Sequence, residues 1–492
     1  MPSLAAALAA LAVAASAAAP IAAAPARSEA DAPAALPSAA PQGPQGIVEA
    51  AGPSAATVAL PEDAPAAPRA YTVERIAFRG LDRVHEWAAR RHLTVREGQT
   101  LEDQRVLVSR LRLLQLGWFS VVETRVEKGS ARGLVVLVFE VVERNTLLVT
   151  DLALGSTRAQ PLYGGLGLSQ QNFLGQGLSL GGGFVYGGAP EGRPADPDRF
   201  AARASFDAPD VSVRGLHLVA GLSANLVRGE ELDCLDADCR AYRGRTGDAP
   251  RLRYQRVGGE ARLGLRPGPF ERLTAGWRVE RLTGTFLAGD GGPIALPPVL
   301  VEGRSLLSAL GVTWEYDDRD DLFLPTEGLL AVAQVTLGSR LLGSDYEYSR
   351  YALQLESGFG LAGRPLRLQG FLGIAQGGAP FFERFYPADL SYFAVGPALG
   401  RAMELNFSTD SRYAAFAAMA GAEYAVPLWG HGAFFQRGYL ALGARAVWSS
   451  QALGGRRNAF SRWPLSLDAA LRLDTPIGTF NASLGALLDN FL

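Results

Sequence analysis

The sequence predicts a mainly β protein, in which a transmembrane antiparallel β-barrel of about 15–16 strands follows one small α/β domain. From about residue 146 onward, segments of roughly 9–14 residues alternate in polarity and are separated by Gly, Pro, Asp or Asn. After the first 30 positions no run of 18 apolar residues occurs, so we expect no transmembrane helix there. Residues 71–144 instead combine strand and helix patterns.

Composition argues against several classes of function. The 492 residues carry a formal net charge of −2, which gives no indication of nucleic-acid binding. The four His are scattered and the two Cys lie far from them, so a zinc cluster is not expected. We see no nucleophile elbow, Walker-type loop or His-Glu-x-x-His motif. We therefore expect no enzyme, no cofactor, no metal site and no nucleic-acid partner.

The N-terminal region predicts export. Residues 1–24 are apolar and rich in Ala and Leu, with small-residue cleavage sites at 15–17 and 22–24, which indicates a signal peptide. No Lys or Arg precedes the apolar core, and a disordered Ala-rich tail is the alternative. Residues 25–70 are rich in Ala and Pro and lack periodicity, so we predict a disordered linker.

Residues 71–144 predict a small α/β domain with the order strand, helices, strand, strand. "YTVERIAFRGL" alternates as a half-buried strand does, and "LEDQRVLVSRLRLLQLG" has mostly helical spacing of Leu and Val up to Gly117. "FSVVETRVEKGSARGLVVLVFEVVER" then gives two strands around a Gly-containing turn.

Residues 146–492 predict the barrel. A soluble β protein would turn the apolar face of such segments inward, whereas a membrane barrel turns it toward lipid. Membrane strands need about 9–11 residues and globular strands average about 5–6, so the length favours the membrane. Short connections such as "APDVSVRG" and "AGRP" are expected in the periplasm, and the long ones at 228–250, 287–303 and 378–410 outside.

Two acidic stretches are candidate sites. "ELDCLDADC" holds Cys234 and Cys239, which in an oxidising compartment could form a disulfide, and calcium binding by its acids is the alternative. In "DDRDDLFLPTEG", side chains on an extended segment alternate in direction, so the four aspartates do not converge on one metal ion. We predict a charged barrel rim and a turn there, with some acids facing an arginine in the lumen.

Several motifs follow one another along the chain. The small domain contains "IAFRGL", "LRLLQLGWFSVVETRV" and "LVVLVFEVVER". The barrel contains "QQNFLGQGLSLGGGF", "YDDRDDLFLPTEG", "GSDYEYSRYALQLE", "PFFERFYPADLSYFAVGP" and "LRLDTPIG". This ordered set resembles the BamA/TamA family of outer-membrane assembly factors, in which periplasmic POTRA domains precede a 16-stranded surface-antigen barrel.

The resemblance implies roles for particular residues. The family's periplasmic turn matches Asp317, Arg319, Asp321, Phe323, Pro325, Thr326 and Gly328, and its POTRA pattern matches Phe78, Gly80, Gly117 and Phe119. The lumen loop of the family carries an arginine that pairs with acids of the inner wall. That Arg-Gly motif is absent here, and Arg384 and Arg401 are the candidate replacements. The last segment, "IGTFNASLGALLDNFL", supplies a fifteenth strand.

The resemblance also implies a function. It predicts a protein of a Gram-negative outer membrane that captures client β-strands with its periplasmic POTRA domain and inserts or translocates them through the barrel. The partners would be outer-membrane lipid, unfolded outer-membrane or secreted clients, and periplasmic chaperones or lipoproteins. The alternatives are a dedicated two-partner-type secretion transporter, a passive outer-membrane pore, and a soluble β-rich secreted protein.

Overall fold

A computed structural model describes residues 71–155, 162–188, 198–213, 216–232, 251–287, 300–321, 324–386, 390, 413–430, 432, 434–450 and 465–488. The predicted signal peptide (1–24) and linker (25–70) lie outside these residues, as do Phe323, Arg401, Cys234 and Cys239. Among the described residues, no helix is both long enough and apolar enough to cross a bilayer.

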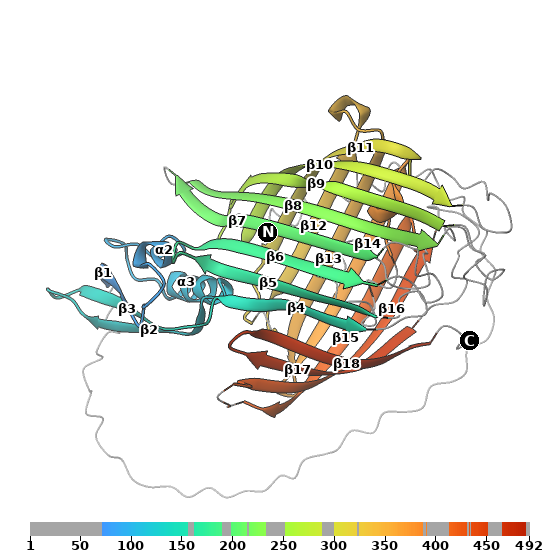
Figure 1. The fold of residues 1–492 in the computed structure, drawn as a ribbon. Coiled ribbons are helices and arrows are strands. Elements are labelled where there is room, and N and C mark those ends of the chain that lie inside the picture. The colour runs from blue at the N-terminus through green and yellow to red at the C-terminus, as the bar shows by residue number, and fades with distance from the viewer. Residues whose placement is uncertain are drawn as a thin grey trace, which may run out of the picture. The chain divides into compact units, whose positions relative to one another are not determined.

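The N-terminal domain contains a three-stranded sheet and two helices (Figure 1). Its elements are β1 (Thr72–Arg79), α2 (Glu86–Arg90), α3 (Asp103–Gln115), β2 (Phe119–Lys128) and β3 (Leu134–Glu143). The strand order is β1-β3-β2, with β1 parallel and β2 antiparallel to the central β3. Strands β1 and β2 therefore form the two edges of this sheet.

A hydrophobic core holds this domain together. Val73 of β1, Leu113 of α3 and Leu137 of β3 are fully buried in it. Helix α3 ends because Gly117 follows with φ +71°, a conformation that favours glycine. The chain then enters β2 with Trp118 and Phe119 turned into the core.

A single antiparallel sheet makes up the rest of the described chain (Figure 1). Its 15 strands pair in chain order. They are β4 (Leu147–Gly155), β5 (Tyr163–Phe173), β6 (Leu178–Gly187), β7 (Arg199–Val213), β8 (Leu216–Leu232), β9 (Arg251–Leu265), β10 (Glu271–Leu287), β11 (Gly303–Asp317), β12 (Leu329–Gly338), β13 (Tyr348–Leu361), β14 (Arg364–Gly377), β15 (Phe416–Trp429), β16 (Arg437–Ser450), β17 (Leu465–Thr475) and β18 (Gly478–Leu488). This confirms the predicted fold class.

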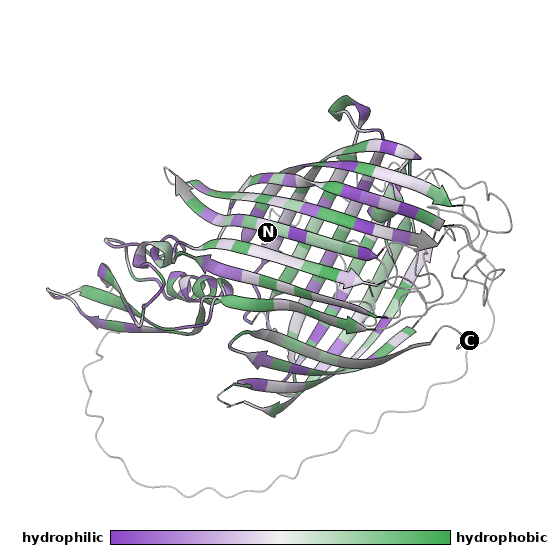
Figure 2. Cartoon of the chain, viewed as in Figure 1, coloured by the Kyte–Doolittle hydropathy of each residue, from purple (hydrophilic) through white to green (hydrophobic). Residues whose placement is uncertain are grey.

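The two faces of the sheet differ in polarity. Leu222, Leu263 and Trp277 are exposed on the outer face, where a bilayer would cover them. Charged side chains such as Glu280 and Glu356 are buried on the inner face. Hydrophobic and hydrophilic residues accordingly alternate along the strands (Figure 2). We call the space that the inner face encloses the lumen.

The two ends of the barrel differ in the length of their connections. The end at which β4 begins carries turns as short as 362–363 and 476–477, and we call it the turn end. The opposite end carries the long connections, including 233–250 and 378–415, and we call it the loop end. Two short 3₁₀ helices, η2 (Arg340–Leu342) and η3 (Phe381–Glu383), lie in connections of the loop end. The predicted asymmetry of loop lengths is therefore present.

Candidate functional site: the seam and the lumen

The first and last strands of the barrel sheet, β4 and β18, form its two edges. In the part of the chain that the structure describes, they do not pair as a ladder. One main-chain hydrogen bond connects them at the turn end, from Val149 N to Ile477 O at 2.8 Å. Gly478 permits this approach, because a Cβ there would lie 2.6 Å from Val149 O. We call the junction of β4 and β18 the seam.

Two of the rim aspartates organise the turn that follows β11. Asp318 accepts a hydrogen bond from Leu329 N at 2.7 Å. Asp320 accepts from both Thr326 N (2.9 Å) and Thr326 Oγ1 (2.6 Å). Gly328 has φ +97°, and a Cβ there would lie 2.7 Å from the Cα of Arg319, so only glycine fits. These contacts build the predicted turn around Pro325.

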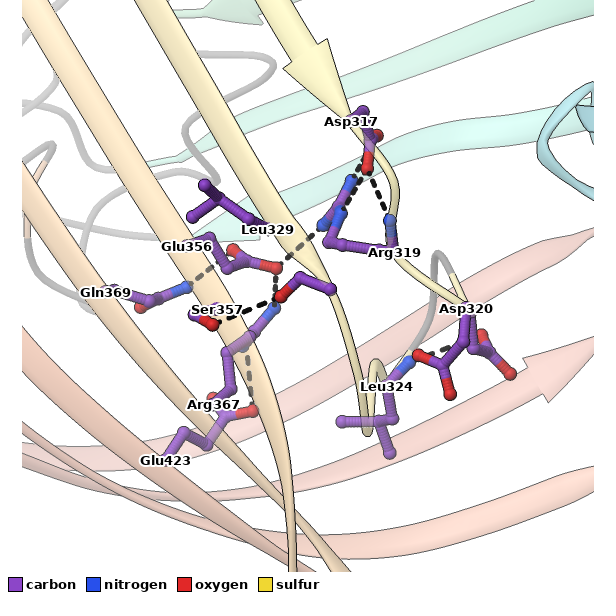
Figure 3. A network of polar contacts seen from close by, with 12 residues as sticks. Asp317, Arg319, Asp320, Leu324, Leu329, Glu356, Ser357, Arg367, Gln369 and Glu423 are labelled. Atoms are coloured by element: carbon purple, nitrogen blue, oxygen red, sulfur yellow. Dashed lines mark hydrogen bonds and ion pairs between the residues drawn. The ribbon is translucent and has the colours of Figure 1, made fainter. Parts of the chain in front are cut away.

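The other two rim aspartates bind arginines. Figure 3 shows Arg319 between Asp317 and Glu356 of β13. The Nε–Oδ1 distance to Asp317 is 2.8 Å, and the Nη1–Oε1 distance to Glu356 is 2.7 Å. Asp321 accepts from Arg437 at the start of β16. In these contacts, the arginines that meet the rim acids come from the rim itself and from β16.

The turn after β11 folds inward and does not simply border the membrane. Leu324 is only 4% exposed and packs against Ala425, Ala441 and Ala470, which lie on the inner faces of β15, β16 and β17. Strands β12, β13 and β14 separate β11 from that wall in the sheet. We call residues 317–321 and 324–328 the strap, because they reach across the turn end of the lumen.

The structure gives no support for a metal at the rim. Among the described residues, no group of three or more His, Cys, Asp or Glu could hold a metal ion. Each rim aspartate binds a different partner.

Alternating charges continue from the strap along the inner wall (Figure 3). Arg367 of β14 lies 3.7 Å from Glu356 and donates to Glu423 of β15 at 3.0 Å. Arg472 of β17 also donates to Glu423. Glu356 and Glu423 are 6% and 2% exposed, so these pairs are shielded from water. Each of these two carboxylates meets two guanidinium groups, so the buried charges compensate one another within one network.

The connection after β14 enters the lumen, where a glutamate side chain holds it to the barrel wall. Glu383 of η3 is buried and accepts from Arg278 of β10. Arg256 of β9 lies over the Phe382 ring at 4.0 Å from its centroid. Arg384, the predicted anchor, donates from Nε to Ala379 O within its own loop at 3.3 Å. At η3, an acid of the connection is therefore bound by an arginine of the barrel wall.

The N-terminal domain contacts the turn end through a buried carboxylate. Asp210 of β7 lies 3.3 Å from His92 Nδ1, 3.5 Å from Arg112 Nη2 and 2.8 Å from His217 Nδ1. Burial, followed by the charge of Arg91 and then of Arg112, holds the pKa of His92 well below its ordinary value. Helix α3 also touches the strap, since the Gln115 amide donates to Asp317 O and to Arg319 O, each at 3.2 Å.

One Gly-x-Ser-x-Gly stretch does occur in the chain, from Gly177 to Gly181, although none was expected. Its Ser179 lies in β6 and donates to Gln171 O at 3.4 Å. A nucleophile elbow needs a sharp strand-to-helix turn, and β6 is followed in the sheet by β7. This serine therefore lacks the setting of a catalytic nucleophile.

Two family models match the chain. One, described as the Omp85 superfamily domain, matches residues 172–490, and this range covers well over half of the sequence. The chain belongs to the Omp85 superfamily. The other model, POTRA, described as a surface antigen variable number repeat, matches residues 71–144. Membership of the superfamily places this protein among outer-membrane β-barrels that assemble or secrete proteins.

Solved structures of Omp85-like barrels are similar to this chain. BamA from Haemophilus ducreyi lacking POTRA domains 1–3 is 19% identical, over 86% of this chain and 82% of that one, with a TM-score of 0.45. CdiB from Escherichia coli is 10% identical, over 85% and 73%, with a TM-score of 0.53. The similarity to CdiB supports the fold.

The residues picked out in the POTRA domain have structural roles. The Phe78 ring stacks on Phe139 at 5.4 Å, and Phe119 is buried beside Trp118. Gly80 has φ +90°, and a Cβ there would lie 2.1 Å from Val141 O. These residues, like Gly117, contribute to the packing and the turns of the domain.

Several residues of this Omp85 site carried no sequence signal that could single them out. Glu383 lies within "PFFERFY", a stretch in which the family resemblance points to an arginine and not to an acid. Asp210, Arg437 and Asp474 are ordinary charged residues on strands. Only the folded barrel brings them to partners far away in sequence, such as Asp321 for Arg437.

Proposed function

We propose that this Omp85 protein inserts client barrel proteins into the outer membrane through its seam, and that it does so without enzymatic catalysis. The observation that supports this proposal is the seam. Strands β4 and β18 are sheet edges, and in the described residues one main-chain hydrogen bond connects β4 to the turn before β18. An exposed edge is a template for an additional strand.

The domain arrangement suggests how a client reaches the seam. We place the turn end and the POTRA domain in the periplasm, since outer-membrane barrels keep short turns on that side. The POTRA sheet leaves β1 and β2 as edges, and either could bind an extended client by strand addition. Periplasmic chaperones or lipoproteins would deliver such clients, and lipid would surround the outer face.

The lumen is an unfavourable route for a client. The strap reaches the wall of β15–β17 at the turn end, and η3 reaches β10 from the loop end. Both contacts would have to break before a chain could pass. This argues for the seam over a passive pore and over secretion through the lumen.

Depletion of the protein from its host tests the proposal. Quantitative proteomics of the outer membrane should then show a broad loss of barrel proteins. Loss of a single secreted protein would instead indicate a dedicated secretion transporter. Unchanged barrel levels together with altered uptake of small solutes would indicate a pore. Either of the last two results would contradict insertion.

Photocrosslinking locates the client on the barrel. A benzoyl-phenylalanine at Leu154, on edge strand β4 and 79% exposed, should crosslink newly made barrel proteins that are lost on depletion. Leu263 is the matched control, because it is 71% exposed but lies on β9, inside the sheet. Equal crosslinking at both positions would mean that clients do not bind preferentially at the seam.

A further inference from the structure

Four charged side chains form a continuous chain at the turn end of the barrel. Arg437 of β16 binds Asp321 of the strap and, through Nη2, Asp474 Oδ2 at 2.8 Å. Asp474 also binds Arg144 Nη2 through its other oxygen, again at 2.8 Å. The Asp474 side chain is 4% exposed, so these two charge-assisted contacts are largely protected from water.

Asp474 stands on one side of the seam and Arg144 on the other. Asp474 is near the end of β17, and the turn after it supplies Ile477 O, which accepts the hydrogen bond from β4. Thr475 Oγ1 donates to Gly478 O at 2.6 Å and fixes the shape of this turn. Arg144 lies three residues before β4 begins. The Asp474–Arg144 ion pair therefore connects the segment just before β4 to the β17–β18 turn.

Arg144 is also attached to the POTRA domain. Its main-chain N donates to Trp118 O at 2.7 Å, and Arg83 Nη2 donates to Arg144 O at 2.8 Å. A displacement of the POTRA domain would therefore move Arg144. A displacement of the strap would move Asp474, because Asp321 of the strap binds Arg437 and Arg437 binds Asp474.

We propose that Asp474 is a positioning residue that pins the turn end of the seam, and that separation of Asp474 from Arg144 lets β4 leave the β17–β18 turn. This deepens the proposed function, on which its biological meaning rests. Among the described residues, the main-chain contact between β4 and the β17–β18 turn is the hydrogen bond from Val149 N to Ile477 O. This bond can form only while β4 lies beside the turn, and the ion pair of Asp474 with Arg144 holds β4 in that position.

Hydrogen exchange of the full-length protein in detergent micelles tests this assignment. In Asp474→Asn, the amides of peptide 147–155 should exchange at least tenfold faster than in the wild type. Arg144→Gln should have the same effect, and the double variant should add nothing further, because both changes break one contact. Asp474→Glu, which keeps the charge, should exchange more slowly than Asp474→Asn.

Asp468→Asn is the matched control. Asp468 lies on the same strand and the same inner face and is 7% exposed, but it is not part of the chain to Arg144. Its variant should leave peptide 147–155 at the wild-type rate. Peptides from β9–β13 and heat-modifiable migration on a gel check in every variant that the barrel has folded.

Two results would overturn the assignment. Wild-type exchange of peptide 147–155 in folded Asp474→Asn would show that the pair does not hold the seam. If Asp468→Asn accelerated the exchange of peptide 147–155 equally, the effect would come from a general destabilisation of β17 and not from the loss of the Asp474–Arg144 contact. If Asp474→Asn does not fold, Arg144→Gln decides in the same way. Faster exchange without more client crosslinking at Leu154 would support the pin and contradict insertion.

Discussion

At the scale of single residues, identical side chains in this protein have different tasks. Asp318 and Asp320 accept from main-chain N–H groups and shape a turn, whereas Asp317 and Asp321 bind arginines. Glu143 of the POTRA domain belongs to the first kind. Its carboxylate accepts from the main-chain N of Asp82, Arg83 and Val84 at 2.9–3.0 Å.

Replacing Glu143 tests the value of such a carboxylate. Burial alone would raise the pKa of Glu143, but these main-chain donors and Arg83 outweigh burial and lower it. We expect Glu143→Gln to destabilise the POTRA domain by about 1.5–3 kcal/mol at pH 7. Urea unfolding of the full chain, followed by hydrogen exchange in peptides of residues 71–144, measures this difference.

The pH dependence of the same variant gives a second check. A carboxyl group with a lowered pKa in the folded state stabilises above its unfolded pKa, about 4.3, and that stabilisation is lost as the pH falls through the folded value. The difference between wild type and Glu143→Gln should therefore shrink below pH 4. A constant difference down to pH 2 would contradict this account.

At the scale of elements, polarity patterns predicted the strands and the order of the POTRA domain, but not the path of the strap or the anchor of η3. Alternation with a period of two tells which face a residue occupies, not which distant residue it meets. Asp321 and Arg437 are 116 positions apart, and Arg278 and Glu383 are 105. Such pairs depend on how the whole sheet curves, which local sequence does not encode.

The Arg278–Glu383 pair can be tested as a double-mutant cycle. Glu383→Ala removes one carboxylate from Arg278, which also lies 3.9 Å from Glu280, and we expect a loss of about 1.5–3 kcal/mol. The double variant Arg278→Ala/Glu383→Ala should cost less than the sum of the single changes, with a coupling of about 0.5–3 kcal/mol. Reversible unfolding in detergent provides the free energies.

An exposed pair serves as the comparison for this cycle. Arg340 and Glu347 lie 3.9 Å apart in the β12–β13 connection, with side chains 78% and 68% exposed. Their coupling should stay below about 1 kcal/mol. If the lumen pair coupled no more strongly than this surface pair, η3 would not be held by charge.

At the scale of the whole molecule, a cluster of charged and titratable side chains lies where the POTRA domain contacts the barrel. His92, Arg91 and Arg112 come from the domain, and Asp210 and His217 from the barrel. Arg266 of the barrel also lies near His92 and Asp210. Because His92 is buried and has a lowered pKa, the docked domain holds this ring in its neutral form.

Docking should therefore weaken in acid. Undocked His92 would take up a proton near its ordinary pKa of about 6.5, and the docked ring only at lower pH, so the undocked state binds more protons just below pH 6.5. Spin labels at Leu107 and Leu216, both exposed, should show a broader distance distribution at pH 5.5 than at pH 7.5. These labels require replacement of Cys234 and Cys239.

The histidine variants identify the group responsible. His92→Gln should flatten the pH dependence, whereas His85→Gln, at the exposed residue that precedes α2, should preserve it. A distribution that broadens equally in His92→Gln would assign the effect to another group.

The two edges of the seam run in the same direction. Each neighbouring pair in the barrel sheet is antiparallel, and β4 and β18 are the first and the last of its 15 described strands. Both therefore begin at the turn end and finish at the loop end, so they cannot extend their contact as another antiparallel ladder. One strand running from the loop end to the turn end would be antiparallel to both. An antiparallel strand added to either edge of the seam would therefore run from the loop end to the turn end.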